Sequence, residues 1–191
     1  MSADVVRKRD AGATREAILA AARRHFAAAG FDGVGVREIA AEAGVNAALV
    51  NRYFGSKEAL FEAVVSEISM EAFMGAPRDR FGEEIATLMA TKSKSADELD
   101  PTLLLVRSIA SPAVGTKLRD AMERGFVAEL AAWLGGEDAE QRAALILVEI
   151  LGFDLLRRVA GLDAFSPAKV EPARRRLART IQAHVDGVDQ G

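Results

Sequence analysis

The sequence predicts an all-α protein of about nine helices, and three observations carry that prediction. Apolar residues recur three and four positions apart through nearly every segment, and no stretch has the strict alternation of a half-buried strand. Half of the 191 residues are hydrophobic, so the chain can bury a sizeable core. Short loops separate the periodic segments, which favours a compact bundle behind a small N-terminal unit.

Three helices are predicted in the N-terminal part, at residues 14–29, 36–43 and 47–53. Thr14 is a suitable N-cap for the first helix, and Gly30 is placed to end it. Gly44 can adopt the left-handed conformation that ends the second helix, and Asn46 can cap the third. The two short helices therefore meet at a tight turn.

Six further helices follow this part of the chain. Ser56 caps a long helix that continues to Phe73, and the segment 75–79, with Pro77, separates it from the next one. The remaining helices are predicted at residues 81–92, 102–110, 111–135, 138–160 and 167–185.

Residues 39–54 have the pattern of a helix-turn-helix, in which the second helix is held rigidly across the first. Their apolar side chains share one face in each helix and fill the turn between them. This inward face consists of Ile39, Ala40, Ala43, Val45, Val50 and Phe54. The outer face of the second helix is then free to enter the major groove of DNA.

The outward residues suit contact with bases and phosphates. Asn51 can pair with adenine, Arg52 can pair with guanine or a phosphate, and alanine methyl groups can contact thymine. A helix N-terminus such as the one at Ser56 also attracts anions. The candidate DNA-binding residues are Arg37, Ala47, Ala48, Leu49, Asn51, Arg52, Tyr53, Ser56 and Lys57.

The charge distribution agrees with a polyanionic partner for the N-terminal part. Residues 1–57 contain nine Lys or Arg and six Asp or Glu, a net charge of +3, which leaves −6 for the rest. The basic segment 7–9 is either a flexible arm for the minor groove or a solubilising tail. The arginine-rich segment 173–179 is interpreted as a solvated helix face.

About fifty consecutive residues resemble the DNA-binding domain of the TetR family of bacterial transcriptional regulators. The resemblance lies in TREAILAAARRHFAAAGF (14–31), IAAEAGV (39–45) and YFGSKEAL (53–60). It implies a three-helix DNA-binding domain at residues 1–55 and a helical ligand-binding and dimerisation domain at 56–191. It also implies contacts to bases or nearby backbone by Arg37, Ala47, Ala48, Leu49, Asn51 and Arg52. Tyr53 and Lys57 fall where the family holds phosphates.

Two positions depart from the family pattern. Members commonly have threonines before the second helix, where this chain has Val34, Gly35 and Val36. Members also commonly have tyrosine at the position of Asn51. The first departure removes a cap and a backbone anchor, and the second is expected to change the sequence that is read.

The C-terminal part is predicted to form a homodimer through the last two helices. The segment AALILVEILGF (143–153) is apolar all round, which indicates burial on more than one face. A buried central helix in a monomer is the alternative. Two-fold symmetry would place two reading helices on a palindromic operator.

Large or adaptable apolar residues of the C-terminal helices form a candidate pocket for a small, mainly apolar effector, although the same spacing fits a simple core. Glu149 and Asp154 could orient a polar ligand or pair with arginines across the dimer. The candidate ligand-binding residues are Phe73, Met74, Met89, Met122, Phe126, Leu130, Trp133 and Phe153.

These observations predict a cytoplasmic, ligand-responsive repressor that releases its operator when the effector binds. The chain has no cysteine and shows no set of nucleophile, base and orienting residue, so no enzyme, cofactor or metal site is predicted. Its longest apolar stretch is too short to span a bilayer. The alternative is an all-helical dimeric small-molecule-binding or scaffold protein without sequence-specific DNA binding.

Overall fold

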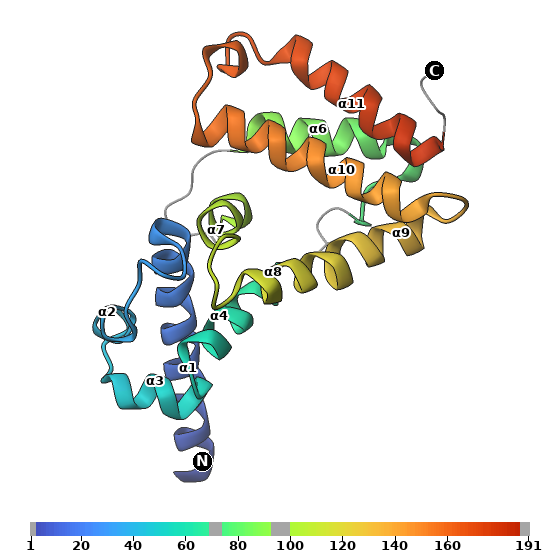
Figure 1. Cartoon of the computed structure of the whole chain (residues 1–191). Helices are drawn as coiled ribbons and strands as arrows, with labels where there is room; N and C mark the ends of the chain where they lie inside the picture. The colour runs from blue at the N-terminus through green and yellow to red at the C-terminus, as the bar shows by residue number, and fades with distance from the viewer. Residues whose placement is uncertain (1–2, 69–73, 93–99, 188–191) are drawn as a thin grey trace. The chain divides into compact units, whose positions relative to one another are not determined.

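A computed structural model describes residues 3–68, 74–92 and 100–187 (Figure 1). Within these ranges the chain forms nine α-helical runs, with α8 and α9 in one of them, and no strand, which confirms the predicted all-α class. The helices are α1 (Ala3–Ala29), α2 (Val36–Glu42), α3 (Ala47–Phe54), α4 (Lys57–Val65), α6 (Phe81–Thr91), α7 (Pro101–Ser108), α8 (Gly115–Ala121), α9 (Ala128–Leu134), α10 (Ala139–Asp154) and α11 (Glu171–Asp186).

Shorter helical pieces complete these runs. A π-helical segment, η2 (Met122–Val127), joins α8 to α9, and a second one, η3 (Leu155–Val159), extends α10. Two 3-10 turns, η1 (Arg78–Arg80) and η4 (Asp163–Phe165), lie before α6 and before α11. None of the helices in the described ranges has both the length and the apolar character needed to cross a membrane.

The largest errors in the predicted helix boundaries lie at α1 and α4, and the helices predicted to start at residues 111 and 167 start at Gly115 and Glu171. α1 begins at Ala3, so Thr14 lies inside the helix and residues 7–9 are helical. Gly12 lies in this run, but one glycine disfavours a helix by only about 1 kcal/mol, too little to break it. α4 ends at Val65, and the hydroxyl of Ser66 donates to the carbonyl of Ala63 at 2.9 Å in its last turn. Phe73 lies outside the described residues.

The packing divides the chain into two compact units. In the described residues, the first unit comprises 3–68 and 100–119, and the second comprises 74–92 and 120–187. The sequence suggests a division at residue 55, whereas the packing places α4, α7 and most of α8 with the N-terminal helices. The reason is that α1 packs against α4 and α7 as well as against α2.

The first unit is organised around three aromatic rings. The centroids of Phe26 and Phe61 lie 5.2 Å apart, those of Phe31 and Phe61 5.4 Å, and all three side chains are buried. The loop after α1 is tied to the end of α7, because the N–H of Phe31 donates to Oγ of Ser108 at 3.1 Å. Ser111 donates to Asp32 at 3.0 Å. The N-terminal helices therefore share one core with α4 and α7.

The second unit is a bundle of α6, α9, α10 and α11. Its core includes the fully buried Phe81, Leu130, Ile146 and Ile181. Arg78 holds two helix ends together, donating to the carbonyls of Trp133 and Leu134 at the end of α9 and to that of Val185 in α11, at 2.8, 2.7 and 3.3 Å. Helix C-termini leave carbonyls without helical partners, and a guanidinium satisfies them well.

Candidate nucleic-acid interface

The turn between α2 and α3 is built from local hydrogen bonds. Gly44 has φ +69°, which lets the chain reverse there. The N–H of Val45 then donates to the carbonyl of Ala40 at 2.9 Å, and Ala40 is almost fully buried. The small side chain at this point lets the two helices approach closely. The turn is thus a rigid connection.

The start of α2 is capped by a residue that sequence reasoning missed. Oε2 of Glu38 accepts from the N–H of Gly35 at 2.7 Å, which is half of a capping box. The sequence held the signal for this cap, because Glu38 stands three residues after Gly35, the residue that precedes α2. Glu38 thus satisfies a backbone N–H at the start of α2. In the family, the threonines before this helix commonly supply a cap.

The predicted cap and inward face of α3 are confirmed. Oδ1 of Asn46 accepts from the N–H of Leu49 at 2.9 Å. Val50 is 1% exposed, and the guanidinium of Arg15 on α1 lies 5.0 Å from the ring centroid of Phe54. Because one side of α3 is fixed in this way, its other side projects at a defined angle from α1 and α2.

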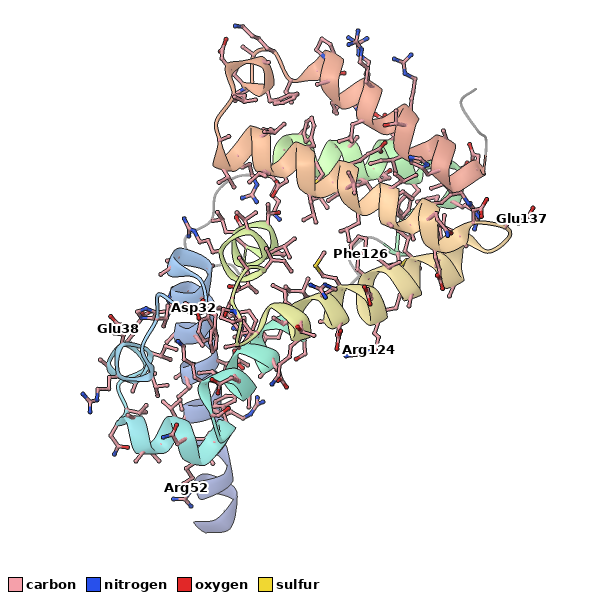
Figure 2. All side chains as sticks on the ribbon, viewed as in Figure 1. Asp32, Glu38, Arg52, Arg124, Phe126 and Glu137 are labelled. Carbon is pink, nitrogen blue, oxygen red and sulfur yellow. The ribbon has the colours of Figure 1, made fainter. Side chains whose placement is uncertain are left out.

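The structure brings the predicted DNA-binding residues together on α2, α3 and the start of α4. Arg52 projects from α3 in Figure 2. The predicted contact residues are exposed or half-buried, and the half-buried Ala47 and Tyr53 also pack against the core of the first unit. The exposed ones are Arg37, Ala48, Asn51, Arg52 and Ser56, and the half-buried ones are Ala47, Leu49, Tyr53 and Lys57.

Ser56 and Lys57 already have contacts inside the first unit. Oγ of Ser56 accepts from the N–H of Ala59 at 3.1 Å, and its hydroxyl also hydrogen-bonds to the carboxylate of Glu58, whose pKa it helps to lower. The ammonium of Lys57 lies 4.1 Å from the ring centroid of Phe31. This contact holds a positive charge at the N-terminus of α4, where the helix itself also favours an anion.

A charged cluster joins α1 to the end of α2. Arg24 pairs with Oε1 of Glu42, and Nε2 of His25 lies 2.7 Å from Oε2 of the same carboxylate. Arg24 and, to a smaller extent, His25 lower the pKa of Glu42 below its ordinary value. Both contacts brace α2, and sequence reasoning identified neither, because the partners are seventeen or eighteen positions apart along the chain.

Six of the candidate ligand-binding residues lie in or against the core of the second unit. Leu130 and Met89 are buried, Phe153 is 9% exposed, and Met74, Phe126 and Trp133 pack against them. Met122 is half-buried on η2. These positions fit both a core and the lining of a pocket that opens around a ligand, so the ligand role stays a prediction.

The two acidic residues of the second unit have partners within it. Asp154 pairs with Arg158 one turn later, and both side chains are almost completely buried. Glu149 accepts from Oγ1 of Thr180 at 3.1 Å and lies 3.5 Å from Nε2 of His184. Asp154 therefore already has an arginine partner in its own chain.

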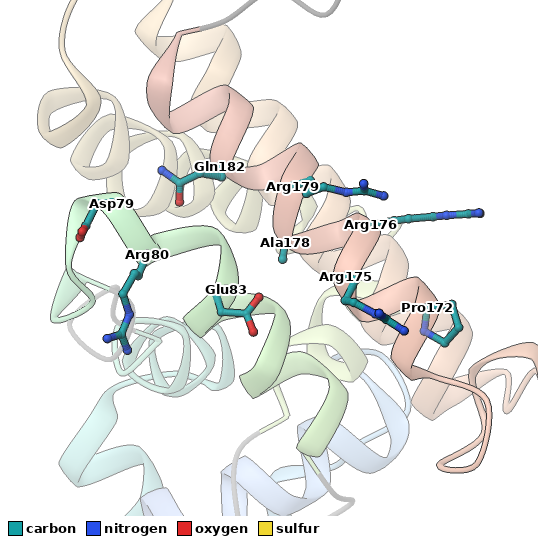
Figure 3. A pocket seen from close by; sticks show the side chains of 9 residues that line it. All are labelled: Asp79, Arg80, Glu83, Pro172, Arg175, Arg176, Ala178, Arg179 and Gln182. Carbon is teal, nitrogen blue, oxygen red and sulfur yellow. The ribbon is translucent and has the colours of Figure 1, made fainter.

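Two surface hollows on this unit are lined by other residues. One, of about 550 Å³, lies between α6 and α11 (Figure 3). Arg175, Arg176 and Arg179 border it, but in Figure 3 their guanidinium groups extend away from α6 and do not converge. The other, of about 920 Å³, lies beside the end of α11 and includes Glu149 and His184.

Comparisons with known proteins assign both parts of the chain. Residues 18–64 match the family model of bacterial regulatory proteins of the tetR family, and residues 79–185 match a tetracyclin repressor-like C-terminal domain. The HTH-type transcriptional regulator RutR of Escherichia coli strain K12 is 41% identical over 86 residues, which cover 45% of this chain. The matched region spans 40% of RutR.

Solved structures extend the likeness over nearly the whole chain. A TetR-family regulator from Streptomyces coelicolor A3 is 31% identical, covers 92% of this chain and 96% of its own, and superimposes with a TM-score of 0.57. Salmonella enterica GusR, at 24% identity, covers 92% and 94% with a TM-score of 0.65, and this likeness concerns the fold alone. Because a family model covers more than half of the chain, the protein belongs to the tetR family of bacterial regulatory proteins.

Proposed function

We propose that this protein is a homodimeric transcriptional repressor whose α3 reads an operator in the major groove. The observation that carries the proposal is the rigid α2–turn–α3 unit, which presents Arg37, Asn51 and Arg52 to solvent from a capped and anchored helix. The assignment to a family of DNA-binding regulators supports it.

Reading is expected to depend on few hydrogen bonds. Asn51 can pair with adenine and Arg52 with guanine, while Ala47, Ala48 and Leu49 offer only methyl contacts and close approach of the backbone. Tyr53, Ser56 and Lys57 are then available for phosphates, which position the helix without reading sequence. DNA shape contributes the rest of the specificity.

Dimerisation is proposed through α10 and α11. α10 carries Leu145 and Val148 and its extension η3 carries Leu156, and these side chains are 47%, 64% and 41% exposed in the single chain. Leucine and valine at this spacing form an apolar stripe, which a second copy of the chain would remove from water. A two-fold axis would present two α3 helices to the halves of a palindrome.

Regulation is proposed to follow from an apolar effector in the second unit. The candidate lining includes Met122 and Phe126 on the π-helical segment η2, and such segments interrupt regular helix packing and often accompany functional sites. An effector that binds better to a dimer geometry unsuited to the operator would lower DNA affinity by population shift. A purely structural role of these residues is the alternative.

A gel-shift experiment on the DNA upstream of the protein's own gene tests DNA reading. Arg52→Ala and Asn51→Ala are expected to weaken binding about tenfold to a hundredfold each, since a good base contact contributes about 1–3 kcal/mol. Arg124→Ala, on the second unit, is the matched control and should bind normally. Unchanged binding by both α3 variants would contradict the assignment, and no binding by any protein would favour a scaffold role.

A further inference from the structure

A titratable pair lies at the seam between α10 and α11. Nε2 of His184 is 3.5 Å from Oε1 of Glu149, and Oγ1 of Thr180 donates to Oε2 at 3.1 Å. The side chains of His184 and Glu149 are 26% and 23% exposed, so each is partly removed from water but still solvated. Val148 and Leu145, which lead the apolar stripe of α10, are one and four positions from Glu149.

The pair and Leu145 line the same hollow of about 920 Å³. Charged groups face this hollow from every element around it. They are Arg78 of η1, Glu137 and Asp138 of the α9–α10 loop, Arg142 of α10 and Asp186 of α11. Arg142 donates to the carbonyls of His184 and Glu137 at 2.9 and 3.1 Å, and Arg78 donates to those of Leu134 and Val185.

Among the residue types that line this hollow, histidine is the one whose ordinary pKa lies nearest to neutral pH. Histidine ordinarily titrates at a pKa of about 6.5. Burial raises the pKa of Glu149 above its ordinary value, against the opposite effects of the Thr180 hydroxyl and of His184.

We propose that a second copy of the chain docks on the α10 stripe and covers the Glu149–His184 pair, which makes dimerisation proton-dependent and tighter at pH 6 than at pH 8. This inference rests on the proposed dimer and adds its regulation.

The sign follows from the charge of the pair. With one proton the pair is neutral overall, and with none it is a single carboxylate, whose removal from water is unfavourable. A dimer that covers the pair therefore favours the singly protonated state and takes up protons on association. The carboxylates of the two copies, both partly desolvated, would disfavour association further at high pH.

The test is fluorescence-detected sedimentation equilibrium of the full chain at pH 6, 7 and 8 and constant ionic strength. The chain has no cysteine, so Gly12→Cys gives one labelling site, at a position where an added side chain meets nothing within 4 Å. The dissociation constant of the dimer is expected to rise at least about tenfold from pH 6 to pH 8, as a one-unit pKa shift per pair would produce.

Two variants separate the roles of the pair. His184→Gln should give a dissociation constant that does not change with pH and stays near the weak value of the unsubstituted chain at pH 8. Glu149→Gln should leave a tight dimer at pH 8, because no carboxylate is covered, and should abolish the tightening at pH 6, because a protonated His184 without its carboxylate would have to leave water. His25→Gln replaces the other histidine, which lies in the first unit, and is expected to keep the full pH dependence.

The outcomes distinguish this inference from the proposed dimer. A dimer whose dissociation constant varies less than about threefold between pH 6 and pH 8 overturns proton dependence and leaves the proposed function standing. Retention of the pH dependence in His184→Gln also overturns it. A monomer at every pH overturns the dimer itself, and this inference with it.

Discussion

The backbone N–H of Gly82 on α6 donates to Oε1 of Gln182 on α11 at 3.0 Å, and Nε2 of the same amide donates to the carbonyl of Arg78 at 3.0 Å. The two helices approach closely here. A Cβ atom added to Gly82 would lie 2.1 Å from the carbonyl oxygen of Ala178 and 2.8 Å from the backbone nitrogen of Gln182. Both obstacles are backbone atoms, which have little freedom to move aside.

Gly82→Ala is therefore expected to lower the free energy of unfolding of the second unit by about 2 kcal/mol or more, as overpacking does. Trp133, the only tryptophan, stacks on Phe81 with centroids 4.9 Å apart, so its fluorescence during urea unfolding reports on this unit. Gly125→Ala is the matched control, since nothing lies within 4 Å of the added carbon. A Gly82→Ala protein as stable as this control would contradict the close approach.

Replacing Asp154 by Ala is expected to destabilise the second unit by about 3–5 kcal/mol, because the buried guanidinium of Arg158 loses its carboxylate partner. The double substitution Asp154→Leu with Arg158→Met should recover most of that loss. Urea unfolding monitored by Trp133 fluorescence measures both. If the double variant is less stable than Asp154→Ala, the pair contributes more than charge compensation.

Removal of the cap of α3 is expected to loosen the reading helix. Asn46→Ala should reduce the stability of α3 by about 1 kcal/mol. It should also speed amide exchange at Leu49, because the N–H of Leu49 donates to Oδ1 of Asn46 in the unsubstituted chain. DNA affinity should fall in parallel. Asn46→Ser retains a capping oxygen and should restore both properties. Unaltered exchange at Leu49 in Asn46→Ala would show that packing alone holds the helix.

Lys57→Ala is expected to weaken DNA binding equally for all sequences, because a phosphate contact carries no base information. The plot of log affinity against log salt concentration should flatten by about one unit of slope. Lys117→Ala, which removes a lysine that pairs with Glu62 in the same unit, is the control and should leave the slope unchanged. An unchanged slope in Lys57→Ala would exclude Lys57 from the phosphate contacts.

The local sequence pattern was sufficient to predict the presence of the helices and of the turn between α2 and α3. The spacing of Ile39, Val50 and Phe54 and the cap at Asn46 were readable because helix periodicity and capping act over three or four residues. The same locality explains the missed start of α1. Thr14 is a good cap, but a cap is used only where the helix begins, and α1 begins at Ala3.

The sequence by itself determined the all-α class, the α2–turn–α3 arrangement and the exposure of Ala48, Asn51 and Arg52 on α3, since each depends on neighbours a few positions apart. Only the tertiary structure decided that α7 joins the first unit through Ser108, that Glu42 braces α2 against α1, and that Glu149 meets His184. These contacts join residues between 17 and 77 positions apart. Such pairings arise from the way whole helices pack, and the periodicity of apolar residues along the chain does not predict them.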